Sequence, residues 1–153
     1  MKKMYIIALL ALLLDQASKY AVRTLMYINQ TIPLIPRVLH FTYVRNAGAA
    51  FGILAGKRLF FIIASLLVVA VLIVYSREIK ENPMLLIAFG LMLGGAVGNL
   101  IDRIWLQWVT DFIDFKFFPP VFNLADSALV IGVALFALDM VMEKKKEREG
   151  RAA

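Results

Sequence analysis

Residues Leu59–Tyr75 have the sequence LFFIIASLLVVAVLIVY and contain no charged side chain. An α-helix needs about 20 apolar residues to cross roughly 30 Å of hydrocarbon. Three further apolar runs have similar lengths, so we predict four spans at about residues 4–22, 59–75, 84–105 and 125–142. Because four spans use roughly 80 residues, we predict one mainly α, membrane-embedded domain over residues 1–153.

The composition agrees with this class. The chain is 61% hydrophobic and 18% charged, whereas soluble domains average about 45–50% and about 25%. An ordinary water-soluble globule is therefore excluded. The absence of cysteine excludes disulfides, cysteine-ligated metals and thiol catalysis. Since His40 is the single histidine, a multi-histidine metal site is excluded too, and we expect no metal and no other cofactor.

Charged residues lie mostly at the ends of the apolar runs. This pattern, with a net charge of +6, favours anionic lipid over nucleic acid as the partner surface. Basic residues are dense in the tail 143–153 and also occur at Lys2 and Lys3. The positive-inside rule therefore predicts that both termini are cytoplasmic. The connections near 23–58 and 106–124 are then extracytoplasmic.

The acidic residues divide by type. All five Glu lie at the predicted cytoplasmic ends, whereas the six Asp lie within or beside the spans or in the outer loop. On this topology five Asp fall in the outer half or just outside it: Asp15, Asp102, Asp111, Asp114 and Asp126. Asp139, near the inner end of the fourth span, is the exception. A carboxylate at membrane depth is costly, so the cluster indicates a functional site.

Several polar and small residues have helical spacing. Asp15 and Lys19 are four apart, which predicts an ion pair on one helix face. Asp102, beside Arg103, is expected in a structural polar network. Gly90, Gly94 and Gly98 also recur every four residues, which lets a neighbouring helix approach closely. We expect this stripe to pack within a monomer.

The first connection contains an alternating segment, Val38–Val44, which predicts a β-strand. The following residues, Arg45–Phe51, are mostly small and bring two donors, from Arg45 and Asn46, to an apolar surface. A tight structural loop and a functional loop remain equally open here. We interpret the aromatic connection 106–124 as an interfacial loop.

Asp111 and Asp126 are the best-placed pair of carboxylates for chemistry. Asn123, three residues before Asp126, predicts a capping box at the start of the fourth span. A pair of carboxylates can hydrolyse a peptide when one is ionised and activates water while the other donates a proton. The two could meet if the loop at Pro119 and Pro120 folds back.

Five motifs occur in order along the chain. They are LDQASK (14–19), RNAGAAF (45–51), GGAVGNLIDR (94–103), VTDFIDF (109–115) and FNLADS (122–127). This ordered set, covering nearly all of residues 4–142, resembles the lipoprotein signal peptidase family, the bacterial signal peptidase II enzymes.

The resemblance implies an aspartyl endopeptidase that removes the signal peptide from bacterial prolipoproteins, cutting before a diacylglyceryl-modified cysteine. It implies that Asp111 and Asp126 are the catalytic dyad. The substrate-binding residues that it implies are Asn46, Asn99, Arg103 and Asn123. Those implied as structural support are Asp15, Lys19 and Asp102.

The resemblance also implies a plasma-membrane enzyme whose active site faces the extracytoplasmic side and takes globomycin-type inhibitors. A small β-sheet and an interfacial helix are expected from the first outer connection. The main alternative is a small ion or proton carrier that uses intramembrane Asp residues. That alternative requires carboxylates along a path, yet Asp139 alone lies near the inner end.

Three further alternatives have less support. The Gly-x-Gly-Asp motif of other membrane aspartyl proteases is absent. A four-span scaffold without chemistry leaves the outer polar cluster unexplained. A Ser–Lys enzyme using Ser18 and Lys19 is conceivable, but neighbouring helix residues point in different directions.

Overall fold

The computed structural model describes residues 1–48, 56–79 and 82–152. Residues 49–51, which end the RNAGAAF motif, lie outside the described residues. Lys80 and Glu81, which are counted among the predicted cytoplasmic charges, also lie outside them. The side chains of Glu147 and Arg151, in the basic tail, are also not described.

Within the described residues, four helices are long and apolar enough to cross a membrane. Their bounds are α1 Lys2–Leu25, α2 Arg58–Ser76, α3 Pro83–Trp105 and α4 Leu124–Ala152. All four predicted spans lie inside these helices. Helix α3 begins sharply because the Asn82 side chain accepts hydrogen bonds from the backbone N–H groups of Met84 and Leu85, and Pro83 follows it.

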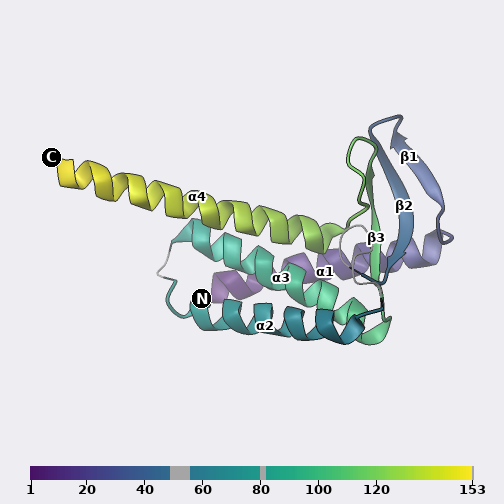
Figure 1. Cartoon of the computed structure of the whole chain (residues 1–153), viewed down its shortest axis with the longest axis horizontal. Helices are drawn as coiled ribbons and strands as arrows, with labels where there is room; N and C mark the ends of the chain where they lie inside the picture. The colour runs from purple at the N-terminus through teal and green to yellow at the C-terminus, as the bar shows by residue number, and fades with distance from the viewer. Residues whose placement is uncertain (49–55, 80–81, 153) are drawn as a thin grey trace.

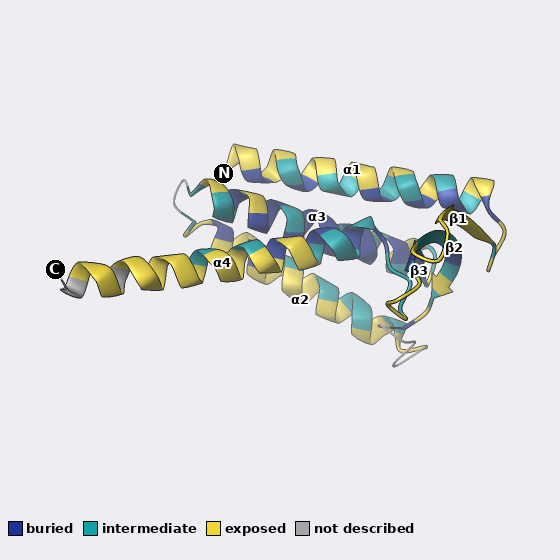
Figure 2. Ribbon diagram, turned by 90° about the horizontal axis from the view of Figure 1, so that it is seen from above, coloured by how far each residue is buried: buried dark blue, intermediate teal, exposed yellow. Residues whose placement is uncertain are grey.

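Helix α3 lies at the centre of the bundle and is the most buried of the four (Figure 2). Helix α1 packs on its glycine stripe so closely that a Cβ at Gly94 would lie 2.5 Å from the Ala8 carbonyl oxygen. On another face, Gly95 contacts the Ala125 backbone of α4. The predicted close approach of a neighbouring helix is thus confirmed, and it occurs within one chain.

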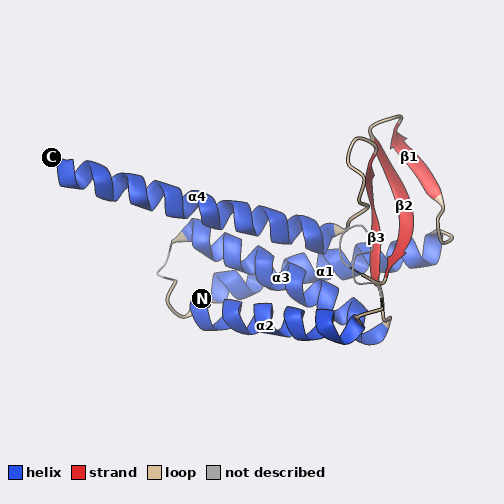
Figure 3. Cartoon of the chain, in the orientation of Figure 1, coloured by secondary structure: helices blue, strands red, loops and turns tan. Residues whose placement is uncertain are grey.

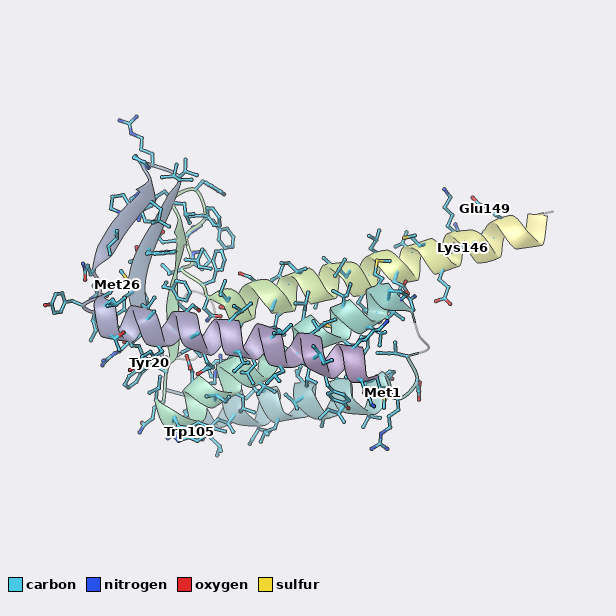
Figure 4. All side chains as sticks on the ribbon, turned by 180° about the vertical axis from the view of Figure 1, so that it is seen from behind. Met1, Tyr20, Met26, Trp105, Lys146 and Glu149 are labelled. Carbon is cyan, nitrogen blue, oxygen red and sulfur yellow. The ribbon has the colours of Figure 1, made fainter. Side chains whose placement is uncertain are left out.

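A three-stranded antiparallel sheet, with order β1-β2-β3, stands at one end of the bundle (Figure 3). Its strands are β1 Thr31–Ile35, β2 Leu39–Asn46 and β3 Val109–Phe115. Both chain termini lie at the opposite end, where α4 runs beyond the other helices (Figure 1). Figure 4 shows the same polarity, with Trp105 at the sheet end and Met1 at the other.

The strand predicted over 38–44 is confirmed as β2. The interpretation of 106–124 as a loop is wrong for its first part, because residues 109–115 form β3 and pair with β2. The first four residues of β3 are all buried, so the strand lacks the polar–apolar alternation that would have indicated it. The predicted interfacial helix has no counterpart in residues 26–48 and 56–57.

Candidate active site

The structure brings Asp111 and Asp126 together, although they belong to different elements. Asp111 lies on β3, and Asp126 lies in the first turn of α4. The chain between them folds back, as predicted. The backbone of Phe122 accepts a hydrogen bond from Ile113 N–H at 2.7 Å and donates one to the Ile113 carbonyl at 3.0 Å. This places the start of α4 against β3.

Asn123 links the two carboxyl groups directly. Its side-chain Nδ2 donates to Asp111 Oδ1 at 2.6 Å, and its backbone N–H donates to Asp126 Oδ2 at 3.3 Å. In return, its Oδ1 accepts from the backbone N–H of Asp126 at 2.9 Å. The last two bonds are the predicted capping box. The cap therefore also fixes the spacing of the two acids.

Two more amides hold the outer sides of the pair. Asn46 Nδ2 donates to Asp111 Oδ2 at 2.9 Å, and Asn99 Nδ2 donates to Asp126 Oδ1 at 2.7 Å. Asn46 reaches this point because the β2–β3 register pairs it with Val109, two residues before Asp111. Each carboxyl group thus receives hydrogen bonds on both of its oxygens.

A buried ionic network lies behind the pair. The predicted ion pair forms, with Lys19 Nζ 2.9 Å from Asp15 Oδ2, and Lys19 is also 3.4 Å from Asp102 Oδ2. The same ammonium donates to Asn99 Oδ1 at 3.0 Å. Lys19 and Asp15 are fully buried and Asp102 nearly so. Because a buried charge is costly without partners, removing one member should destabilise the others.

This network also anchors both elements that carry the acids. Asp15 Oδ1 accepts from the backbone N–H of Ala125 at the start of α4, at 2.9 Å. Asp102 Oδ2 accepts from the backbone N–H of Thr110, beside Asp111, at 2.9 Å. The structure therefore brings all nine residues predicted for the site into one connected cluster, with Arg103 on its rim.

Sequence reasoning missed three residues of this network, namely Gln16, Arg23 and Thr110. Gln16 Nε2 donates to the Gly98 carbonyl at 3.1 Å and to Asp102 Oδ1 at 3.3 Å. Arg23 Nη1 donates to Thr110 Oγ1 at 3.2 Å. A signal for Arg23 did exist, because Asp15, Lys19 and Arg23 follow one another every four residues on α1.

A cavity of about 600 Å³ opens beside the pair. Its polar lining includes Asn46, Arg103, Asp111 and Asp126, and its apolar side comes from the aromatic connection before α4 and from Val130 and Ile131. The Arg103 guanidinium lies 5.1 Å from the centre of the Phe61 ring of α2. The cavity thus joins two acids, one cation and an apolar wall.

Burial, together with the nearby negative charge of Asp126, raises the pKa of Asp111 from 3.8 to about 7. The amide donors of Asn46 and Asn123 act in the opposite direction. Near neutral pH this carboxyl group therefore exists in both protonated and ionised forms. Two close carboxyl groups in one cavity, one of them titrating near neutrality, can act as a general acid–base pair.

The other two Asp residues predicted near the membrane lie elsewhere. Asp114 is 2.6 Å from Lys116 Nζ and accepts a hydrogen bond from Thr42 at 2.6 Å. Asp139 Oδ1 accepts a hydrogen bond from Asn82 Nδ2 at 2.8 Å, at the α3 start. Among the described residues, no group of three or more His, Asp or Glu could hold a metal ion.

Comparisons with known proteins give one consistent family. Residues 7–142 match the family described as signal peptidase (SPase) II. A lipoprotein signal peptidase of Halothermothrix orenii is 46% identical over 141 residues, which are 92% of this chain and 97% of that protein. One of Shouchella clausii is 48% identical over 145 residues, 94% of this chain and 96% of that protein.

Two solved bacterial membrane enzyme structures share the fold. The first has a TM-score of 0.87 and 37% identity and covers 95% of this chain and 92% of its own. The second has a TM-score of 0.82 and 38% identity, with 92% and 93% covered. The chain, a multi-pass membrane protein, therefore belongs to the signal peptidase II family of aspartic peptidases.

Proposed function

We propose that this enzyme removes the signal peptide from bacterial prolipoproteins, cutting before the diacylglyceryl-modified cysteine, with Asp111 and Asp126 as its catalytic dyad. The observation that carries this proposal is the bridge formed by Asn123. Asn123 donates hydrogen bonds to both carboxyl groups, at 2.6 Å and 3.3 Å, and both acids line the same cavity. An ion carrier is not favoured, because its carboxylates would have to follow a path across the bilayer.

In the proposed reaction, Asp111 carries the proton and Asp126 is ionised. Asp126 lies at the N-terminus of α4, where the helix dipole favours a negative charge. Asp126 takes a proton from water as the water oxygen attacks the scissile carbonyl carbon, and Asp111 donates its proton to the carbonyl oxygen. The C–N bond then breaks, and Asp126 returns its proton to the leaving nitrogen while Asp111 regains its own. The pair titrates as a unit throughout.

The surrounding polar residues have three proposed tasks. The amides of Asn46, Asn99 and Asn123 hold the carboxyl groups in place. Asn46 lines the cavity and binds substrate backbone, whereas the buried Asn99 and Asn123 shape the pocket from behind. Arg103 lines the cavity and binds substrate carbonyl groups. Asp15, Lys19 and Asp102 support the site from behind.

The apolar wall suits a substrate that is itself held in lipid. Phe117, Phe118, Val130 and Ile131 line the cavity and are all exposed at the surface of the protein. In a bilayer such side chains would contact acyl chains rather than water. A lipidated precursor could thus reach the dyad laterally, while water reaches it from the membrane boundary.

The proposed orientation places the sheet and the dyad on the extracytoplasmic side of the plasma membrane and both termini in the cytoplasm. Its support is that the termini share the end of the bundle opposite to the sheet (Figure 1), where basic residues are dense. We further propose that the enzyme acts as a monomer, because its glycine stripe is occupied by its own α1. No nucleic acid partner is expected.

The test is cleavage of a lipidated precursor by purified enzyme in detergent, followed by gel shift. Asp111→Asn and Asp126→Asn should each lower the rate by on the order of a thousandfold or more, since each removes one half of the acid–base pair. Asp139→Asn is the matched control, because this acid bonds to Asn82 at the far end of the bundle. Full activity of either dyad variant would refute the assignment.

A further inference from the structure

Arg58 is a cation in an unfavourable local position. It is the first residue of α2, and the first turn of that helix holds no acidic residue. The N-terminal end of a helix carries partial positive charge, so a cation there is disfavoured. The local structure of α2 therefore gives no reason for an arginine at this position, and its reason must lie in another element.

That other element is the C-terminal turn of α3. Arg58 Nε donates to the Arg103 carbonyl at 2.9 Å, and Arg58 Nη2 donates to the Ile104 carbonyl at 2.8 Å. The last carbonyl groups of a helix lack partners within the helix and carry partial negative charge. Helices α2 and α3 lie side by side (Figure 1), so the first residue of α2 reaches these groups.

The residue whose carbonyl Arg58 binds also has its side chain in the cavity. The Arg103 guanidinium lines the cavity and lies 5.1 Å from the ring centre of Phe61, which is one turn after Arg58 on α2. The start of α2 thus contacts Arg103 at two points, through its backbone and through its side chain.

The end of α3 is also where the chain turns sharply toward β3. Helix α3 is followed by Leu106 as its C-cap and then by Gln107, whose φ of 73° is left-handed and unusual for a residue with a side chain. Asp111 follows four residues later. A turn of this kind is kept only when its surroundings hold it, and the two hydrogen bonds of Arg58 supply such a constraint.

We propose that Arg58 is a positioning residue for the active site: it fixes the last turn of α3, which keeps the Arg103 guanidinium in the cavity beside the dyad. This inference rests on the proposed function, because it assumes that Arg103 binds substrate. It assigns to α2 a role in the site that none of the five sequence motifs covers.

The first experiment compares Arg58→Gln with Lys57→Gln. Lys57 is the neighbouring cation and its side chain is exposed, so the control removes the same charge from the same end of α2. With lipidated precursor as substrate, Arg58→Gln should raise KM by roughly tenfold, because a misplaced contact weakens substrate binding, and should leave kcat within about threefold. Lys57→Gln should change neither. An unchanged KM in Arg58→Gln would overturn the proposal.

Two further variants separate positioning from general stabilisation. Arg58→Lys keeps the charge but offers one ammonium in place of the planar fork, so its KM should lie between those of the parent and Arg58→Gln. In a double-mutant cycle, Arg58→Gln should add little to the effect of Arg103→Gln, since both act on the same contact. Full additivity of the two effects on KM would show that Arg58 acts elsewhere.

Hydrogen exchange gives a readout that needs no activity. The backbone N–H of Leu106 donates to the Asp102 carbonyl at 2.8 Å in the last turn of α3. Arg58→Gln should speed exchange in residues 103–107, and Lys57→Gln should not. Unchanged exchange would refute the role of Arg58 in fixing the last turn of α3, whatever substrate the enzyme cleaves. Faster exchange in an enzyme inactive on prolipoproteins would instead locate the failure in the proposed function.

Discussion

Asp111 supplies the ionisation that controls the proposed acid–base pair. Burial and the charge of Asp126 bring its pKa to about 7, and the mechanism requires its protonated form. As pH rises through this value the proton is lost, so kcat/KM should fall on the alkaline side with an apparent pKa near 7. The measurement is kcat/KM from about pH 5 to about pH 9. A profile without an alkaline limb would contradict the assignment of the proton to Asp111.

A substitution at Asn46 should shift this pH profile. Its hydrogen bond to Asp111 favours the ionised carboxylate and lowers the pKa. Asn46→Ala should therefore raise the pKa of Asp111 and move the alkaline limb to higher pH. Thr42 lies on the same strand as Asn46 but donates its hydrogen bond to Asp114. Thr42→Val is therefore the control, and it should leave the alkaline limb of the profile where it is.

At the residue scale, the sequence predicts local pairs better than distant ones. Asp15 and Lys19 are recognisable because they are four apart on one helix, and Asn123 and Asp126 because they form a capping box. The bond from Lys19 to Asn99, 80 positions away, follows from helix packing alone. Arg58 could not be identified, because its partners are backbone carbonyls, which every residue has.

At the element scale, the same limit explains β3. Helices α1 to α4 are predictable because each needs a long apolar run, and β2 because its residues alternate. Strand β3 is buried at Val109 through Phe112, where it pairs with β2 and where Thr110 is bonded to Arg23 of α1 and Asp102 of α3. A short segment buried in this way has no periodic pattern, so sequence alone cannot separate it from an apolar loop.

The glycine stripe on α3 predicts different outcomes at two of its positions. A Cβ at Gly94 would lie 2.5 Å from the Ala8 carbonyl, so Gly94→Ala should push α1 away and lower stability by about 1–3 kcal/mol. A Cβ at Gly98 would lie 2.5 Å from Asp15 Oδ2, so Gly98→Ala should also disturb the ionic network behind the dyad.

Thermal unfolding in detergent and the cleavage assay distinguish the two variants. Gly94→Ala should lower the melting temperature but keep most of the cleavage rate at low temperature. Gly98→Ala should lower both the melting temperature and the cleavage rate. Gly150→Ala is the control, because a Cβ there meets nothing within 4 Å. Equal losses of rate in the two stripe variants would show that α1 packing, rather than Asp15, limits activity.

At the scale of the whole molecule, the buried ions of the candidate active site and the exposed cations of the C-terminal tail lie at opposite ends of the bundle. The fully buried ions Asp15 and Lys19 lie toward the sheet, whereas the exposed cations of the tail lie beyond the other end (Figure 1). Buried ions in a membrane protein are tolerated when they pair and serve a site. The positions of the Asp and the basic residues along the chain predicted this separation, and the fold adds that the outer Asp residues meet in one cluster beside the sheet.

This separation predicts a topology that thiol labelling can test without background, because the chain has no cysteine. Pro36→Cys lies in the exposed turn between β1 and β2, and Lys2→Cys and Lys145→Cys lie near the termini. A membrane-impermeant maleimide should label Pro36→Cys in right-side-out vesicles and the other two in inside-out vesicles. All three should react after detergent permeabilisation, which controls for burial. Labelling of Lys145→Cys from the outside would reverse the orientation, and the dyad would then face the cytoplasm, where a precursor exported through the membrane could not reach it.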